Sequence, residues 1–282
     1  MQQSDVVRRS RTASRALQQP DAPPRYDLSY RDTFWKSRAY EDLCDRIALR
    51  ALLGGGTGHL LDLGAGFGRL VDEYGAFERV TLVDASPVMV SAARERVGAD
   101  PRFSALQAQA AALPIAASSI DVVVAVRLLV HLADPEPVFQ EIARVLRPGG
   151  HVVIEFPNRG HLMAWVRYLT RRQAWMPQAQ RPHEYLEGHF AHHPARVERQ
   201  LRAAGLEPME RRSVSLFRSA VLKKMIPARM LALLEAPLQA PLAVLAPGPS
   251  LYLLARLPGA GHGGGEAPPP GRVEVVTSGG RS

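Results

Sequence analysis

A glycine-rich loop preceded by a carboxylate is the part of this chain best suited to holding a ligand. Residues 60–70 read Leu-Leu-Asp-Leu-Gly-Ala-Gly-Phe-Gly-Arg-Leu, with Asp62 ahead of the loop. The glycines stand at alternate positions, Gly64, Gly66 and Gly68. A parallel strand that turns sharply into a helix needs glycine where the backbone adopts positive φ or closely approaches a ligand. Because Arg69 occupies the place of the third glycine in G-x-G-x-x-G, a dinucleotide fingerprint is excluded.

A second carboxylate, Asp84, follows twenty positions after Gly64, at the end of the apolar run from Val80 to Val83. A carboxylate at the tip of a second strand can accept hydrogen bonds from both ribose hydroxyls of an adenosine ligand. Ser86 and Pro87 then predict the start of a helix. Asp84 is therefore either a ribose ligand, which the glycine loop favours, or a cap of that helix.

Alternating strands and helices must position these residues at one edge of a sheet. Apolar and β-branched runs predict strands near 60–63, 80–83, 103–106, 120–126, 152–156, 214–217 and 250–255. A helix before the glycine loop is expected to bury Tyr40, Leu43, Ile47 and Ala51. Another is expected to bury Val138, Phe139, Ile142, Val145 and Leu146 and to end at the run 147–150. This alternation favours an α/β fold with a parallel sheet covered on both faces.

Composition limits the class of protein. The chain has 282 residues, 46% of them hydrophobic and 22% charged, which suits one packed domain with additions. Its single cysteine, Cys44, excludes an internal disulfide and a cysteine-rich zinc site, so we expect a reducing, cytoplasmic setting. The net charge of +8 is moderate, and no basic and aromatic stripe suggests a nucleic-acid partner.

Changes in composition along the chain suggest its organisation. We expect a disordered basic arm over 1–25, a domain over 26–258 and a disordered Gly/Pro-rich tail over 259–282. Within the domain we expect N-terminal cap helices over 26–56, a substrate lid over 157–193 and a helical insertion over 219–247. Prolines and Glu235 exclude a regular membrane span in the insertion. It either packs on the domain, which we favour, or contacts lipid or a hydrophobic partner.

A series of short motifs follows the glycine loop in a characteristic order. They are Ala112-Leu113-Pro114, Ser119-Ile120-Asp121-Val122-Val123, Val130-His131-Leu132 and the run from Glu141 to Gly150. In this series the chain resembles S-adenosylmethionine (SAM)-dependent methyltransferases of the Rossmann-like class I, in their small-molecule, methyltransferase type 11-like branch. The resemblance covers about residues 60–156. It implies a seven-stranded, mostly parallel sheet whose last strand is antiparallel, with helices on both faces and a helical C-terminal insertion.

The resemblance also implies a cofactor, SAM, and a site for it. The implied cofactor-binding residues are Arg38, Asp62, Gly64, Ala65, Gly66, Gly68, Asp84, Ala85, Gln109, Ala110 and Arg127. Gln109 stands where family members often carry an acid, and its amide oxygen can accept the same bond from adenine. Arg127 would pair with the methionine carboxylate or an anionic substrate, or else form a surface salt bridge. The segment 30–38 either covers the cofactor or seals the domain edge.

The implied reaction is methyl transfer to an oxygen, nitrogen or carbon atom of a small, apolar or ring-bearing acceptor, which leaves S-adenosylhomocysteine. His131 is either a general base or a packing histidine. Tyr185 and His189, in the expected lid, are candidate substrate contacts. Trp165, Tyr168 and Trp175 would line the same cleft or pack in the core. The spacing of His183, His189, His192 and His193 matches no common metal motif, so we expect no metal.

A protein that binds SAM without turnover, as a regulator or a partner- or lipid-interacting protein, is the competing hypothesis. The absence of an unambiguous base and the apolar insertion motivate it. No Asn/Asp-Pro-Pro-Tyr/Phe motif follows residues 120–126, which disfavours amino-group methylation of adenine or glutamine. The sequence leaves the acceptor, the methylated atom and the oligomeric state open.

Overall fold

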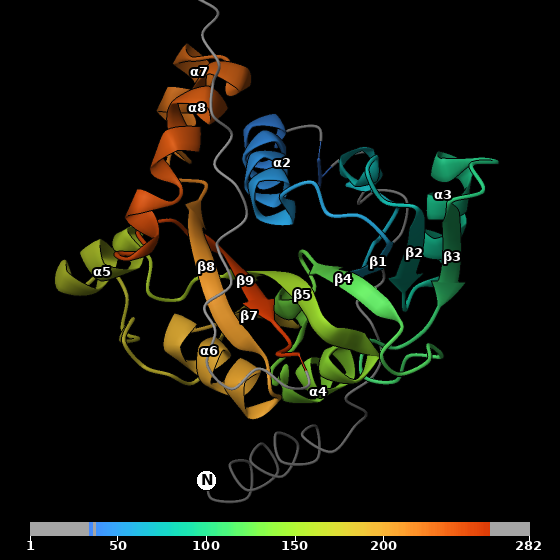
Figure 1. Ribbon diagram of the computed structural model, residues 1–282. Helices are drawn as coiled ribbons and strands as arrows, with labels where there is room; N and C mark the ends of the chain where they lie inside the picture. The colour runs from blue at the N-terminus through green and yellow to red at the C-terminus, as the bar shows by residue number, and fades with distance from the viewer. Residues whose placement is uncertain (1–33, 36–37, 260–282) are drawn as a thin grey trace, which may run out of the picture.

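Seven strands form one twisted sheet at the centre of the molecule (Figure 1). The computed structural model describes residues 34–35 and 38–259; the expected arm over 1–25 and almost all of the expected tail lie outside these residues. The strands are β1 (His59–Leu63), β2 (Arg79–Asp84), β3 (Phe103–Gln107), β4 (Ile120–Ala125), β5 (Leu146–Pro157), β8 (Glu207–Val214) and β9 (Ser250–Arg256). Their order is β3-β2-β1-β4-β5-β9-β8. Only β9 runs antiparallel to its neighbours in this sheet, which confirms the predicted fold class.

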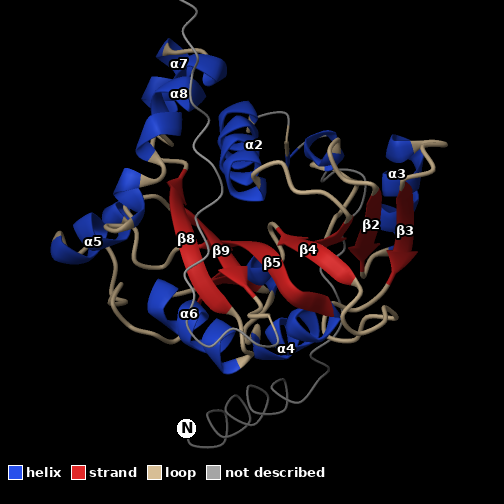
Figure 2. Ribbon diagram, viewed as in Figure 1, coloured by secondary structure: helices blue, strands red, loops and turns tan. Residues whose placement is uncertain are grey.

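Helices cover both faces of the sheet (Figure 2). They are α2 (Ala39–Leu53), α3 (Pro87–Val97), α4 (Glu136–Val145), α5 (Leu162–Leu169), α6 (Pro194–Ala203), α7 (Ala220–Met225) and α8 (Ala228–Glu235). One apolar core lies between the sheet and α2, α3 and α8, and the other lies beneath α4 and α6. Because both faces are buried, the central strands carry unbroken apolar runs, 122–125 in β4 and 152–154 in β5. Within the described ranges, every helix falls short of the length and apolar character that a membrane crossing requires.

Helix α2 buries a broader side than predicted. Tyr40 is buried, and Leu43 and Ile47 pack partly buried against the core, as expected. Cys44 and Ala48 are more deeply buried than they are, and Ala51 is exposed. Two carboxylates, those of Glu41 and Asp45, also lie on the buried side. Counting apolar residues alone missed these two acids, because they are buried through basic partners from distant parts of the chain.

Strand β8 corrects a second prediction. It spans Glu207–Val214, so Leu216 and Phe217 lie after it. As the edge strand it pairs with β9 alone, and most of its residues are polar, which hid it from a search for apolar runs. A third difference is that β5 begins at Leu146, so it includes this residue, which was expected in the preceding helix, and the run 147–150.

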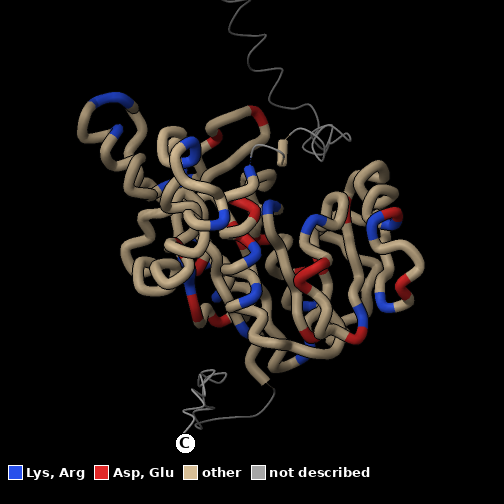
Figure 3. Tube along the Cα trace, turned by 90° about the horizontal axis from the view of Figure 1, so that it is seen from above, with Lys and Arg blue, Asp and Glu red and all other residues tan. Residues whose placement is uncertain are grey.

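The region after β5 holds α5 and a small hairpin of β6 (His183–Leu186) and β7 (His189–Ala191). The region after β8 holds α7, α8 and two short 3₁₀ turns, η5 (Ala236–Leu238) and η6 (Pro241–Ala243). These helices lie beyond the β8 edge of the sheet, with α8 against α2 (Figure 1). Seen from above, the segment at the far left of the molecule bears Lys and Arg without Asp or Glu (Figure 3).

A buried carboxylate, Glu235, attaches the insertion to the domain. Its oxygens accept hydrogen bonds from the amides of Ser215 at 2.8 Å and Leu216 at 2.7 Å, and from the hydroxyl of Tyr40 in α2. That hydroxyl in turn accepts a bond from the amide of Phe217 at 2.7 Å. Burial, together with the neighbouring Glu235, raises the pKa of Tyr40, so the hydroxyl keeps its proton. The network satisfies a fully buried charge, which would otherwise be very costly.

We expect Glu235→Ala to lower the free energy of unfolding by about 3 kcal/mol, because it leaves two backbone amides and the Tyr40 hydroxyl without their acceptor. Denaturant unfolding followed by circular dichroism measures this change. Glu207→Ala, at an exposed position of β8, is the matched control and should alter stability by less than about 0.5 kcal/mol. Equal effects of the two substitutions would contradict the attachment role of Glu235.

Candidate functional site

The carboxyl ends of β1, β2 and β4 meet at one edge of the sheet and bring the predicted site residues together. Gly64 follows β1, Asp84 ends β2 and Arg127 comes two residues after β4. A cavity of about 40 Å³ lies over this edge. Its lining includes Trp35, Asp62, the loop 64–67, Arg69 and Arg127. In open α/β sheets, ligands bind at such an edge, outside the carboxyl ends of the strands.

Two positions of the loop require glycine for different structural reasons. Gly64 has a φ of +79°, and a Cβ there would come within 3.2 Å of the Leu128 side chain. Gly66 also has a positive φ, +56°, but a Cβ there would meet no heavy atom within 4 Å. Gly64 is therefore needed for packing against Leu128, whereas Gly66 borders open space that a ligand can occupy.

Asp84 fixes the loop from the neighbouring strand. Its carboxylate accepts hydrogen bonds from the amide of Gly66 and from that of Ser86, each at 2.9 Å. Burial raises the pKa of Asp84, and these two amides oppose the rise. The cap of α3 is Ser86, whose hydroxyl accepts a bond from the amide of Met89 at 3.4 Å, so the interpretation of Asp84 as the helix cap is wrong.

The loops after β2 and β3 are held side by side. The amide of Ala108 donates to the carbonyl of Asp84, and the side-chain amide of Gln107 donates to the carbonyl of Ala85, both at 3.1 Å. Gln109 and Ala110 follow in the same loop, and the side chain of Gln109 is exposed. The structure thus places three predicted residues, Ala85, Gln109 and Ala110, near Asp84.

Asp62 is a buried acid beneath the glycine loop. Its carboxylate accepts a hydrogen bond from the hydroxyl of Tyr74 at 2.9 Å. Burial raises the pKa of Asp62 to about 7, although the Tyr74 bond favours the charged form. At neutral pH this carboxyl is therefore poised between its two protonation states, and a nearby cation would favour the ionised one.

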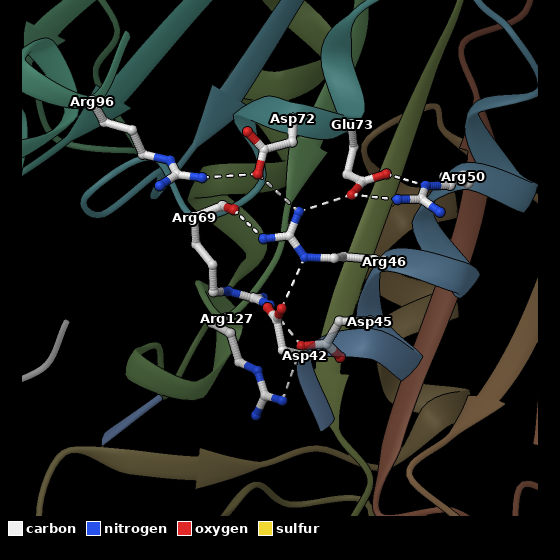
Figure 4. Close-up of polar contacts among 9 residues, drawn as sticks. All are labelled: Asp42, Asp45, Arg46, Arg50, Arg69, Asp72, Glu73, Arg96 and Arg127. Carbon is white, nitrogen blue, oxygen red and sulfur yellow. Dashed lines mark hydrogen bonds and ion pairs between the residues drawn. The ribbon is translucent and has the colours of Figure 1, made fainter. Parts of the chain in front are cut away.

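A group of charged residues that the sequence did not reveal borders the cavity (Figure 4). Asp45 of α2, which is fully buried, pairs with Arg69 at 3.1 Å and with Arg127 at 3.3 Å. Burial would lower the pKa of Arg69, but the nearby carboxylates of Asp45 and Asp42 outweigh it, so the pKa is raised. The guanidinium of Arg69 also lies 3.9 Å from the centre of the Trp35 ring.

The position of Asp45 on α2 could have predicted this group of charges. Asp45 lies between Cys44 and Ala48, two of the buried apolar residues of that side. An acid at such a position requires a basic partner, because an unpaired charge is rarely buried.

Arg127 and Arg38 differ in their relation to the cavity. Arg127 lines it in a left-handed conformation, with a φ of +63°, and its amide donates to the carboxylate of buried Glu155 at 3.0 Å. This conformation is unusual for a residue other than glycine and commonly occurs at functional sites. The guanidinium of Arg38 instead lies 4.0 Å from the centre of the Phe34 ring.

The three candidate acceptor-side residues are brought together at the other end of this edge. The ring of His131, in the 3₁₀ turn η4 (Leu129–His131), lies 5.0 Å from that of His189 in β7. The ring of Tyr185 in β6 lies 6.2 Å from His189. Burial, reinforced by His189, lowers the pKa of His131 to about 4, so the ring is neutral at pH 7.

The remaining histidines and aromatics of the expected lid have separate partners. His183 packs on Trp175, with ring centres 4.3 Å apart, and buried His192 bonds to the carbonyl of Leu129 at 3.0 Å. Trp165 contacts Tyr168 and lines a second cavity of about 220 Å³, so these three aromatics do not form one wall. Among the described residues, no three His, Cys, Asp or Glu side chains are grouped as a metal site requires.

Comparison with known proteins links the site region to a family. Residues 61–154 match the model of a methyltransferase domain family. An uncharacterized methyltransferase of Mycobacterium tuberculosis is 36% identical over 125 residues, which are 43% of this chain and 49% of that protein. The ubiquinone/menaquinone biosynthesis C-methyltransferase UbiE of Shewanella frigidimarina is 31% identical over 173 residues, 57% of this chain and 66% of that protein.

The fold has relatives among solved structures. A SAM-dependent methyltransferase of Thermotoga maritima aligns with a TM-score of 0.58 and 17% identity, covering 82% of this chain and 96% of that one. A likeness at this identity shows the fold alone. In sequence, the chain spans about half the length of the first curated relatives that it matches.

We expect the stability of the protein, relative to Asp62→Asn, to fall as the pH rises from about 4 to about 7. The folded-state pKa of Asp62 is raised from 3.8 to about 7, so the folded protein holds this proton more tightly than the unfolded chain does. Its stabilising contribution is complete below the unfolded pKa and is lost as the pH approaches the folded one, by at most about 1.4 kcal/mol per unit. Denaturant unfolding across this range tests it, and a constant difference between the two proteins would refute it.

Proposed function

We propose that this chain, which carries a SAM-dependent methyltransferase domain over residues 61–154, transfers the methyl group of SAM to a small-molecule acceptor and releases S-adenosylhomocysteine. The observation that carries the proposal is the contact between the two predicted elements of the site. The carboxylate of Asp84 accepts a hydrogen bond from the amide of Gly66 at 2.9 Å, at the point where the loop borders open space. A nucleoside seated there would meet both the loop backbone and a carboxylate.

The described residues fit SAM by their chemistry. Asp84 would accept from the ribose hydroxyls, and Gln109 with the amide of Ala110 would contact the adenine ring. Asp62, whose buried carboxyl has a pKa of about 7, would be ionised beside the ammonium of the methionine part. Arg69 and Arg127, held by Asp45, would attract its carboxylate. Trp35, which lies against Arg69, would cover the site from the side of α2.

When bound, SAM supplies a methyl group that its sulfonium already activates. The protein's part is to align the acceptor and to exclude water, which can contribute roughly 7–11 kcal/mol to lowering the barrier. The region of α5, β6 and β7 would provide the acceptor side, with His131, His189 and Tyr185 facing one another there. With its lowered pKa, His131 would act as a hydrogen-bonding and positioning group or a weak base.

SAM binding without turnover is the second candidate. The lowered pKa of His131 favours it, because a general base works best with a pKa near the working pH. Incubation of the purified protein with methyl-labelled SAM and small-molecule extracts of its host, followed by mass spectrometry, separates the two. A labelled product supports methyl transfer, whereas tight SAM binding with no product from any extract supports the second candidate.

We expect Asp84→Ala and Gly66→Val each to weaken SAM binding by about 100-fold, since the first removes a charged acceptor and the second strains a positive-φ turn. Titration calorimetry with SAM and with S-adenosylhomocysteine measures this. The matched controls are Asp72→Ala, at an exposed acid, and Gly75→Val, at a glycine with equal open space but a φ of −58°. The proposal fails if the folded wild-type protein binds neither compound.

We expect the rate of methyl transfer to show no pH-dependent step from His131 between about pH 6 and about pH 8. Its pKa is about 4, so the ring stays unprotonated over this range and would lose its proton-accepting form only as the pH falls toward 4. Rates at saturating acceptor, for the wild type and His131→Gln, measure this. A step near neutral pH that His131→Gln removes would show that the ring titrates in the working range.

A further inference from the structure

An apolar surface that the proposed reaction does not use lies beyond the β8 edge of the sheet. Helix α8 buries Leu231 and Ala232 against the domain, yet its opposite side exposes Leu233 and Leu234. The exposed fractions of Val244, Leu245, Met225 and Leu169 are 85%, 78%, 76% and 74%. A single exposed apolar side chain is common on protein surfaces, but a contiguous group of them marks an interaction site.

These side chains form one surface, which we call the outer face: the exposed sides of α5 with residues 170–172 after it, of α7 and α8, and of the segment 236–245. The amide of Leu162 at the start of α5 donates to the carbonyl of Pro247 at 3.0 Å. Trp165 of α5 and Val244 line the same 220 Å³ cavity. Helix α8 leads through η5 and η6 to this point, so α7, α8 and α5 follow one side of the molecule (Figure 1).

The charge of the outer face has a single sign. The exposed charged side chains of this face are all basic: Arg167, Arg171, Arg172, Lys224 and Arg229. The acid of α8, Glu235, is fully buried. Arg171, Arg172, Lys224 and Arg229 are exposed, and none of them pairs with a carboxylate among the described residues. Helix α5 lies at the far left in Figure 1, and in Figure 3 the segment at the far left bears Lys and Arg without Asp or Glu.

We propose that the outer face docks on an anionic lipid bilayer. Exposed leucine, valine and methionine side chains would enter the boundary between headgroups and acyl chains, and the arginines and lysines around them would contact anionic headgroups. A second copy of this chain is a poorer occupant, because a twofold interface would place these unpaired cations against their own counterparts. The proposal stands on this surface alone and does not depend on methyl transfer.

The test is sedimentation of the full chain with vesicles of phosphatidylcholine, and with vesicles of phosphatidylcholine mixed with phosphatidylglycerol. We expect binding to the mixed vesicles, little binding to phosphatidylcholine alone, and a loss of binding as salt is raised. Absence of binding to the mixed vesicles at low salt overturns the proposal. Equal binding to both kinds of vesicle, insensitive to salt, also overturns it.

Two pairs of variants test the named side chains. Arg171→Gln with Lys224→Gln should weaken binding to the mixed vesicles by about 30-fold, whereas Arg79→Gln with Arg94→Gln, at the opposite edge of the sheet, should change it little. Leu233→Ser with Val244→Ser should weaken it roughly tenfold or more, whereas Val88→Ser in α3 should not. Equal losses in the test and control variants overturn the assignment to this face.

These variants separate an effect on lipid binding from an effect on folding, because every substituted side chain is exposed. Circular dichroism should be unchanged in all of them, and SAM titration should give the same result as for the wild type. Sedimentation velocity tests the other occupant. The lipid proposal is overturned, and the face assigned to a second copy, by two results together. The wild type forms a dimer that the double substitution Leu233→Ser with Val244→Ser dissociates, and it does not bind to the mixed vesicles.

Discussion

The pairing of one buried carboxylate with two arginines joins the parts of this molecule. Asp45 projects from α2 and bonds to Arg69, which follows the loop after β1, and to Arg127, which follows β4. A buried carboxylate left without partners would cost far more than a typical contact contributes, so the three side chains must come together. Helix α2 is thereby fixed over the carboxyl ends of the strands, with two cations beside the cavity (Figure 4).

The same principle recurs where the insertion meets the domain. Glu235 is fully buried, and its acceptors are used by backbone amides after β8 and by Tyr40 of α2. Helix α2 therefore carries two buried polar contacts, one toward the site and one toward the insertion. These contacts specify positions that apolar packing alone would leave free to slide, because a hydrogen bond has a defined geometry and a hydrophobic contact does not.

The two halves of the chain serve different parts of the proposed function. Residues 61–154, which match the methyltransferase domain family, contain the glycine loop, Asp84 and Arg127. The hairpin of β6 and β7 carries Tyr185 and His189, while α5 and the insertion carry the outer face. The proposed contact of the outer face with lipid would give the apolar character of the insertion a physical use.

The sequence by itself determined the class of fold, the glycine loop with Asp84, and five of the seven strands almost to their ends. These features follow from local rules, since turns need glycine and buried parallel strands need unbroken apolar runs. Only the tertiary structure decided the burial of two acids on α2, the extent of β8, and the group formed by Asp45, Arg69 and Arg127. Those depend on pairs of charges far apart in the chain, and no local pattern records which partner will neutralise a buried acid.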